Sequence, residues 1–398
     1  MTAASPLRLH YLDGLRASLM VLGIPYHSAL AFSGLPWLIG TDAPSPLLIA
    51  FAEFLHIWRM PTFFIVAGFF ALMVIRRRGP RRWYAGRMQR LGIPLLFGIV
   101  VLSPIQWAII AASRGARGRS IWDFLVAQWS HPGSYWTMHL WFLVVLLIYS
   151  GVLALLFVPP VRTHVARATA AITGRLAGWR FGLPTYLAVS SAIVVVGLAV
   201  WTAGGIAGLL SNLVSRNLVI YAPSFLTGLV LAFRPAYLER FMQLRRTPLL
   251  VAGLATAVYF IGMALAGASD SPVALVTQAV LWPVAGLVWA ALAFKVATRV
   301  FRERSRIIDW LVDSSLVVYL VHQPLVLGFA LLFIGAGVPS LVGFVLTVIL
   351  TALVAGVAYE LVNCVPVLRF LMTGSAAPGT GLLSGVRMRR REPEASPS

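Results

Sequence analysis

The first apolar stretch of the chain carries three ionisable residues where a membrane helix normally has none. Asp13, Arg16 and His27 lie in and around LDGLRASLMVLGIPYHSAL, which is otherwise apolar enough to enter a bilayer. Ionisable groups within a membrane helix cost free energy, so they indicate a function by default. The rise of a helix separates Arg16 from His27 by roughly 16 Å, about half of a hydrocarbon layer of about 30 Å. One helix is therefore expected to hold a guanidinium near one membrane face and an imidazole near the middle.

Other ionisable residues occur in later apolar stretches, at depths that overlap with that of His27. Histidine titrates near neutrality and can act as general base for a hydroxyl nucleophile, and the carboxylate of Glu53 would orient that imidazole as in a catalytic triad. A lone buried histidine is more often a structural hydrogen-bond partner, but several beside a carboxylate and an arginine predict a polar cavity that opens outward. The residues expected to form it are His27, Glu53, His56, Arg59, His139, Trp141, His322 and Gln323.

A second candidate site lies in the arginine-rich segment IRRRGPRRWYAGRMQRLGIP. Its first arginines are explained as charges that keep a loop on the cytoplasmic side. Arg87 and Arg90 are three residues apart and share a helix face, with Arg16 at a similar depth. Because a guanidinium binds phosphate oxygens through a planar fork, these three are candidates for an anion pocket. Asp13 would pair with one of them; topology and phosphate binding both remain open as explanations.

Composition places these residues in a membrane protein. The chain has 398 residues, of which 59% are hydrophobic and 11% charged, whereas a soluble domain carries about 25% charged residues. The net charge of +20 is concentrated between apolar runs, which the positive-inside rule explains without nucleic acid as a partner. A single cysteine, Cys364, excludes an intramolecular disulfide, and neither a metal ion nor a bound cofactor is expected.

The apolar runs predict an all-α polytopic integral membrane protein of about ten transmembrane helices. With both termini cytoplasmic, every lysine and arginine falls on the inner side except Arg59, Arg114, Arg117, Arg119 and Arg216, as the positive-inside rule requires. Residues 1–372 would form the membrane domain, and 373–398 a disordered basic cytoplasmic tail that touches anionic lipid. The expected spans are 12–34, 46–74, 92–112, 139–158, 184–202, 218–233, 248–267, 274–294, 310–334 and 340–362.

The longest outer loop, residues 113–138, is rich in aromatic side chains, including Trp122, Trp129 and Trp136. Tryptophan and tyrosine at this depth usually anchor a protein at the membrane interface. The alternative is a platform on which a sugar ring stacks, and the sequence leaves the two open.

These residues resemble those of membrane acyltransferase family 3. Arg16 and His27 with ten residues between them, together with Arg87-x-x-Arg90, look like the paired signatures of that family. The segments FLHIWRMPTFFIVAGFF, RLGIPLL and HLWFLVVLL add to the similarity. The resemblance is strongest over residues 8–150, returns around His322, and is weak between about 160 and 300.

The resemblance implies a ten-helix enzyme of the bacterial inner membrane that acylates envelope sugars or peptides from a cytoplasmic acyl-CoA. His27 would be the catalytic base or a transient acyl carrier, and Arg16, Arg87 and Arg90 would bind the donor. Similarity within the family implies succinyl-CoA as donor, glucose hydroxyls of an osmoregulated periplasmic β-glucan as acceptor, and glucan synthase machinery as a further partner. Arg59 would then bind the free carboxylate of the succinyl group, or else form a structural pair with Glu53 or a carboxylate of another helix.

Other functions remain open. One alternative is an acyltransferase that moves an acetyl-type group from acetyl-CoA to another envelope or exported polysaccharide. A transporter of anionic metabolites would use the same cavity, but transporters usually show inverted repeats and broken helices, and neither is visible in the sequence. The acyl group would reach the outer side either on the pantetheine arm, which we favour, or as an acyl group on His27.

Overall fold

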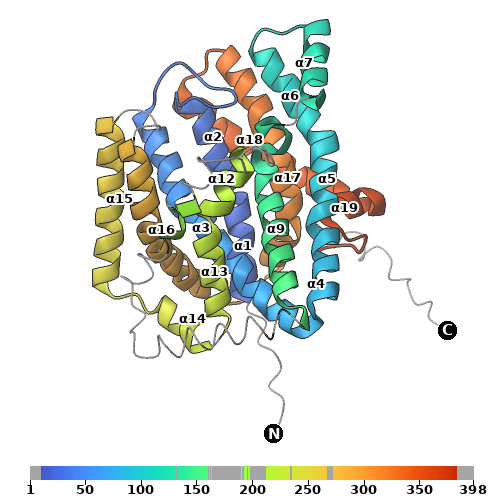
Figure 1. Cartoon of the computed structure of the whole chain (residues 1–398). Coiled ribbons are helices and arrows are strands. Elements are labelled where there is room, and N and C mark those ends of the chain that lie inside the picture. Colours follow the sequence, from blue (N-terminus) through green and yellow to red (C-terminus); the bar gives the residue numbers. More distant parts are fainter. Residues whose placement is uncertain are drawn as a thin grey trace, which may run out of the picture.

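The chain is a bundle of helices in the computed structural model (Figure 1). The structure describes residues 10–130, 133–159, 212–233, 235–266, 272–303 and 305–382, with a few isolated positions between 161 and 197. Within these ranges seven helices are long and apolar enough to cross a membrane, or up to eight if one bent helix pair counts as a span. The protein is therefore an all-α, multi-pass membrane protein, as predicted.

The predicted apolar runs coincide with described helices, except 184–202, which lies almost entirely outside the described residues. Proline at the start of many helices suits the first turn, where its missing N–H is not needed. The helices are α1 (His10–Val21), α2 (Gly23–Phe32), α3 (Pro46–Arg78), α4 (Pro80–Arg87), η1 (Met88–Gly92), α5 (Ile93–Phe97), η2 (Gly98–Leu102), α6 (Ser103–Ser113), α7 (Arg119–Ser130), α8 (Ser134–Thr137), η3 (Met138–Leu140), α9 (Trp141–Leu156), α12 (Asn212–Ile220), α13 (Ala222–Leu231), α14 (Pro235–Met242), α15 (Arg246–Ala266), α16 (Pro272–Val300), α17 (Arg306–Gly335), α18 (Ser340–Cys364) and α19 (Pro366–Thr373).

The first apolar stretch forms two helices, α1 and α2, separated only by Leu22. Pro25 has no N–H to donate to the carbonyl of Val21, which accounts for a break at this point. Both helices pack against α17, and α2 also packs against α3 and α18. Arg16 therefore lies on one helix and His27 on the next, with α2 higher in the view of Figure 1 than α1.

The bent pair α12 and α13 is a broken helix that we did not predict from the sequence. Its two parts meet at Tyr221 with an angle of 41°. The α13 part crosses α3 closely, because a Cβ on Gly68 would lie 2.1 Å from the carbonyl oxygen of Phe225, and one on Gly228 2.1 Å from that of Ile65. Small residues allow such close contact between membrane helices. This crossing fixes α13 and thereby places α12 against α9.

The segment 75–91, expected to be a cytoplasmic loop, is helical on both sides of Gly79, which has a φ of +75°. The helix that follows changes to π geometry at η1, which carries Arg90. Short π segments within helices are frequent at functional sites. The α3–α4 junction and α14 lie at the same end of the bundle, the lower end in Figure 1, so two of the arginine-rich segments share one side.

The loop 113–138 contains α7 and α8. The ring of Trp129 meets Trp107 at 5.4 Å and Trp136 at 5.1 Å between centroids, both edge to face. The exposed Trp122 stays apart from this cluster as a candidate interfacial anchor. Anchoring at the membrane interface and stacking of a sugar ring both remain predictions for these aromatic residues.

Residues 374–382, which we name the C-terminal strap, lie against the helices, although we expected disorder from residue 373 onward. The side-chain amide of Gln89 donates to the carbonyl of Gly374 at 3.0 Å, which ties the strap to η1. The rest of the predicted tail, 383–398, lies outside the described residues. Further bonds to the strap backbone come from Arg306, Asp313, Tyr359, Glu360, Asn363 and Arg369 of α17, α18 and α19.

Candidate functional site

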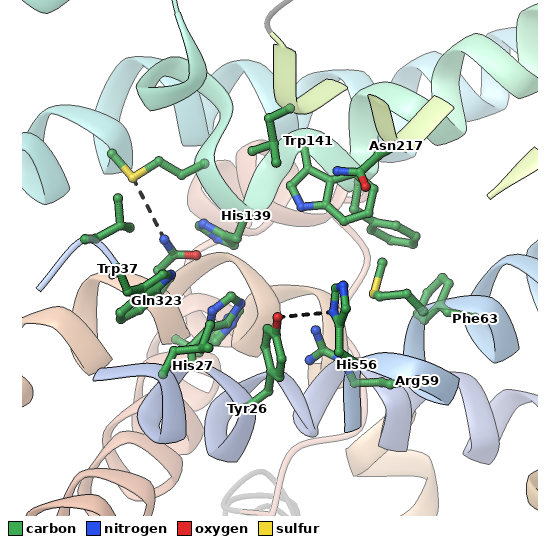
Figure 2. A pocket seen from close by; sticks show the side chains of 18 of the residues that line it. Tyr26, His27, Trp37, His56, Arg59, Phe63, His139, Trp141, Asn217 and Gln323 are labelled. Atoms are coloured by element: carbon green, nitrogen blue, oxygen red, sulfur yellow. Dashed lines mark hydrogen bonds between the residues drawn. The ribbon is translucent and has the colours of Figure 1, made fainter. Parts of the chain in front are cut away.

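A cavity of about 690 Å³ lies between α1, α2, α3, the η3–α9 segment, α12 and α17. Every residue predicted for the outward cavity lines it. Figure 2 shows the side chains of six of them, His27, His56, Arg59, His139, Trp141 and Gln323, converging from several helices. The structure thus brings together residues far apart in sequence. The predicted residues in its wall are His27, Glu53, His56, Arg59, His139, Trp141, His322 and Gln323.

Three of the cavity histidines form a row. The imidazole of His322 lies 5.2 Å from that of His27 and 5.2 Å from that of His139, between ring centroids. His139 follows Met138, a non-glycine residue with a φ of +35°, and backbone conformations of this kind cluster at functional sites. On its other side His27 stacks on Trp37 at 5.6 Å. Within the described part of the chain, no group of three or more His, Cys, Asp or Glu residues has the arrangement to hold a metal ion.

The hydrogen bonds of these histidines are incomplete. Nδ1 of His322 lies 2.6 Å from the carbonyl oxygen of Tyr319, whereas its Nε2 is buried without a partner, as is Nδ1 of His27. Buried polar atoms in folded proteins are nearly always hydrogen-bonded. Unpartnered nitrogens in a cavity wall are therefore free to bind a ligand.

Arg59 places a buried cation beside the histidines. Its side chain is 7% exposed, and its guanidinium lies over the ring of Tyr26, 4.5 Å from the centroid. The hydroxyl of Tyr26 forms a hydrogen bond of 3.1 Å with Nδ1 of His56. Among the described residues the one ion pair is that of Arg16 with Asp13, so Arg59 has no carboxylate partner there. A buried cation without a counter-ion is costly, and an anionic ligand would offset that cost.

Glu53 lies in the cavity wall, but its partner is a tyrosine of α15. Its carboxylate accepts a hydrogen bond of 2.7 Å from the hydroxyl of Tyr259. It therefore makes no ion pair with Arg59 in the described structure. The catalytic role predicted for Glu53 beside His27 stays a prediction.

The predicted donor-binding residues gather at a second place, outside the cavity. Arg16 pairs with Asp13 at 3.7 Å, and Arg87 lies within electrostatic range of both Arg16 and Arg90. The guanidinium of Arg87 also lies over the ring of Trp83, 5.6 Å from its centroid. A cluster of three cations with one carboxylate retains excess positive charge, which suits an anion such as a phosphate.

Several residues of the cavity wall were not predicted from the sequence. Tyr26, Trp37 and Tyr319 supply ring faces and hydrogen bonds, and Arg216 and Asn217 line the wall from α12. Figure 2 shows Tyr26 between His27 and His56. The sequence signal that could have identified Tyr26 as a cavity residue was its position next to His27. Arg216 was assigned to an outer loop. The available signal for the break was Pro223, which has no N–H to donate to the carbonyl of Val219.

Comparisons with known proteins identify the family of the chain. Residues 9–360 match the family model described as an acyltransferase domain. The chain is 30% identical over 380 residues to proteins named glucans biosynthesis protein C from Salmonella schwarzengrund (strain CVM19633) and Salmonella agona (strain SL483), covering 94% of this chain and 97% of each relative. No solved structure matches the chain. The chain therefore belongs to the membrane acyltransferase family 3 that its sequence resembles.

Proposed function

We propose that this protein transfers a succinyl group from cytoplasmic succinyl-CoA to glucose hydroxyls of an osmoregulated periplasmic glucan. Its family supports acyl transfer, and the name of its relatives, glucans biosynthesis protein C, supports a glucan acceptor. The observation that carries the choice of donor is Arg59, a buried cation beside the cavity histidines with no carboxylate partner in the described structure. A succinyl group brings such a carboxylate, whereas an acetyl group does not.

Arg59 would discriminate by charge. A guanidinium binds a carboxylate through two parallel hydrogen bonds, and in a low-dielectric cavity this pairing offsets the desolvation of both ions. Its Nε has no partner among the described residues and would be one of the donors. With acetyl-CoA the cation would remain unpaired, so transfer should be slower.

The donor would bind in two parts. Arg16, Arg87 and Arg90 would hold the phosphates of CoA at the inner end, and the pantetheine arm would carry the thioester to the cavity. His27 would meet the acyl group there, either as the base for the glucan hydroxyl or as its transient carrier. Asp13 would keep Arg16 in place through their ion pair. The arginine-bearing end would face the cytoplasm of a bacterial inner membrane, and lipid and the glucan synthase machinery are expected partners.

The test uses the full chain in lipid nanodiscs with succinyl-CoA or acetyl-CoA, and with linear or cyclic β-glucan. We expect release of free CoA that depends on glucan, with succinyl esters detected on the glucan by mass spectrometry. A preference for acetyl-CoA would overturn the proposed donor. In proteoliposomes, movement of succinate across the membrane without thioester cleavage would instead support a transporter, which would also use a broken helix such as α12–α13.

A further inference from the structure

We propose that His322 is a second catalytic histidine, whose Nε2 accepts the proton of the acceptor hydroxyl. This inference rests on the acyl transfer proposed above and concerns the same cavity. The general base would then be His322 of α17, in addition to the role proposed for His27 of α2. Three features of the described structure carry it: a fixed tautomer, a nitrogen without a partner, and a position in the cavity wall next to Arg59.

The tautomer of His322 follows from its hydrogen bond. A carbonyl oxygen only accepts, so the Nδ1 that lies 2.6 Å from the carbonyl of Tyr319 must carry the proton. Nε2 then has a lone pair as long as the ring is neutral. His56 differs, because its partner is the hydroxyl of Tyr26, which can donate or accept. His27 differs as well, since its Nδ1 has no partner.

Fixing one nitrogen by a hydrogen bond is how proteins prepare a histidine for proton transfer. The bond sets the ring orientation and defines which nitrogen is basic. The other nitrogen of His322, Nε2, is buried and has no partner within the described residues. A buried lone pair without a hydrogen-bond donor is costly for a structural histidine. A general base, in contrast, needs a free lone pair to accept the proton.

Gly23 allows His322 and Arg59 to approach the same point of the cavity wall. A Cβ on Gly23 would lie 2.9 Å from Nε2 of His322 and 3.3 Å from a terminal guanidinium nitrogen of Arg59. Gly23 is itself part of the cavity wall. A base and a cation therefore meet at one glycine of α2, which suits a hydroxyl at His322 and the acyl carboxylate at Arg59.

Bonds and protons balance both in direct transfer from CoA and in transfer through an acyl group on His27. The acceptor oxygen forms a bond to the acyl carbon while its proton passes to Nε2 of His322. The tetrahedral intermediate then collapses and expels the leaving group. Nε2 returns the proton to that group, which is the CoA thiolate in direct transfer or the ring nitrogen of His27 if His27 carries the acyl group. His322 ends neutral and no other reactant is needed.

The test compares two nucleophiles in the His322→Asn variant, again with the full chain in nanodiscs. Asparagine keeps an N–H near the position of Nδ1 for the carbonyl of Tyr319 and lacks Nε2. We expect glucan-dependent transfer to fall roughly 10²- to 10⁴-fold, the usual contribution of a general base. CoA release with hydroxylamine, a strong nucleophile that needs no base, should fall less than about tenfold, and the KM for succinyl-CoA should change little. His10→Asn, a histidine of α1 outside the cavity wall, serves as control.

Equal losses with glucan and hydroxylamine would overturn the proposal in favour of a structural role, and so would a wild-type rate. The slow hydrolysis of succinyl-CoA without glucan provides a separate measurement, because water also needs the base. A wild-type protein that hydrolyses succinyl-CoA but does not transfer to glucan would refute the acceptor, while the hydrolysis rate of His322→Asn still decides the role of His322. A wild-type protein that does neither refutes both.

Discussion

The cavity and the C-terminal strap use polar groups in opposite ways. At the strap, the side chains of α17, α18 and α19 satisfy one backbone group after another, as when Asn363 accepts from the N–H of Gly379 and donates to its carbonyl. In the cavity, buried nitrogens of His27, Arg59 and His322 have no partner within the described residues. A satisfied network stabilises a fold, whereas unsatisfied groups lower its stability and are kept where a ligand completes them.

This difference predicts two kinds of mutant. Substitutions in the cavity should change rates and leave stability equal or higher, because removal of strained or unpaired groups often stabilises an active site. Substitutions at the strap should lower stability with small effects on chemistry. The following variants test the comparison, from the largest expected effect to the smallest.

His27→Ala should give the largest loss. Without the imidazole, neither the base nor the acyl-carrier role of His27 remains, so glucan-dependent CoA release should fall by at least about 10²-fold. The thermal unfolding midpoint should change little, because Nδ1 of His27 has no hydrogen bond to lose and the half-buried ring loses only its ring contacts, such as the stacking on Trp37. CoA release at the wild-type rate would show that His27 takes no part in the reaction.

Arg59→Met should remove the preference for succinyl-CoA. Methionine fills a similar volume without charge, so kcat/KM for succinyl-CoA should fall about 100-fold, as expected for a lost charge-assisted pair. The rate with acetyl-CoA should change only a few fold. Stability should rise by about 1–4 kcal/mol, since apolar replacements of buried charges are often stabilising. A parallel fall with both donors would mean that Arg59 holds the cavity in shape rather than selecting the acyl group.

Gly23→Ala should lower the rate about tenfold, because its Cβ would lie 2.9 Å from Nε2 of His322 and force that ring to move. The matched control is Gly253→Ala in α15, where a Cβ has nothing within 4 Å. The control should keep full activity and gain up to about 1 kcal/mol from helix propensity. Both variants are compared by steady-state kinetics and thermal unfolding. An unchanged rate in Gly23→Ala would argue against a close approach of His322 to this glycine.

Asn363→Ala should act on stability instead. It removes the bonds of Asn363 to Gly379 and Arg369, at a cost of about 1–3 kcal/mol for unpaired buried groups. The rate with saturating succinyl-CoA should stay within a few fold of the wild type. The measurement is thermal unfolding in the same nanodiscs as the rate assay. A large loss of rate without loss of stability would contradict the expectation that strap residues stabilise the fold while cavity residues determine the rate.

The sequence predicted the chemistry of the cavity better than its geometry. His139 and His322 could be assigned to the cavity because ionisable residues within apolar runs have few reasons to be there. Tyr26, Trp37 and Tyr319 escaped prediction because aromatic residues are common in membrane helices and carry no such signal. The bend at Tyr221 escaped as well, because Pro223 was read as part of a continuous apolar run rather than as the start of a new helix.

The strap illustrates a different limit. Its glycine-rich composition, with Pro378, is typical of disordered segments. Its own residues contribute mostly backbone groups to the bonds. The partners belong to helices that precede it by many residues, such as Asp313 and Arg306 of α17. The composition of a segment does not predict its contacts with helices far away in the sequence. Only the structure reveals such contacts.

The bond between Gln89 and Gly374 joins residues 285 positions apart. During translation, α4 and α5 would enter the membrane long before Gly374 has been made. The arginines next to Gln89 would therefore acquire their final surroundings only after most of the chain has been synthesised, since contacts of large sequence separation form slowly. In a growing chain the proposed donor-binding end would be completed after the helices around the cavity histidines of α2 and α3. A translation product interrupted before Gly374 would lack the bond that joins this residue to Gln89.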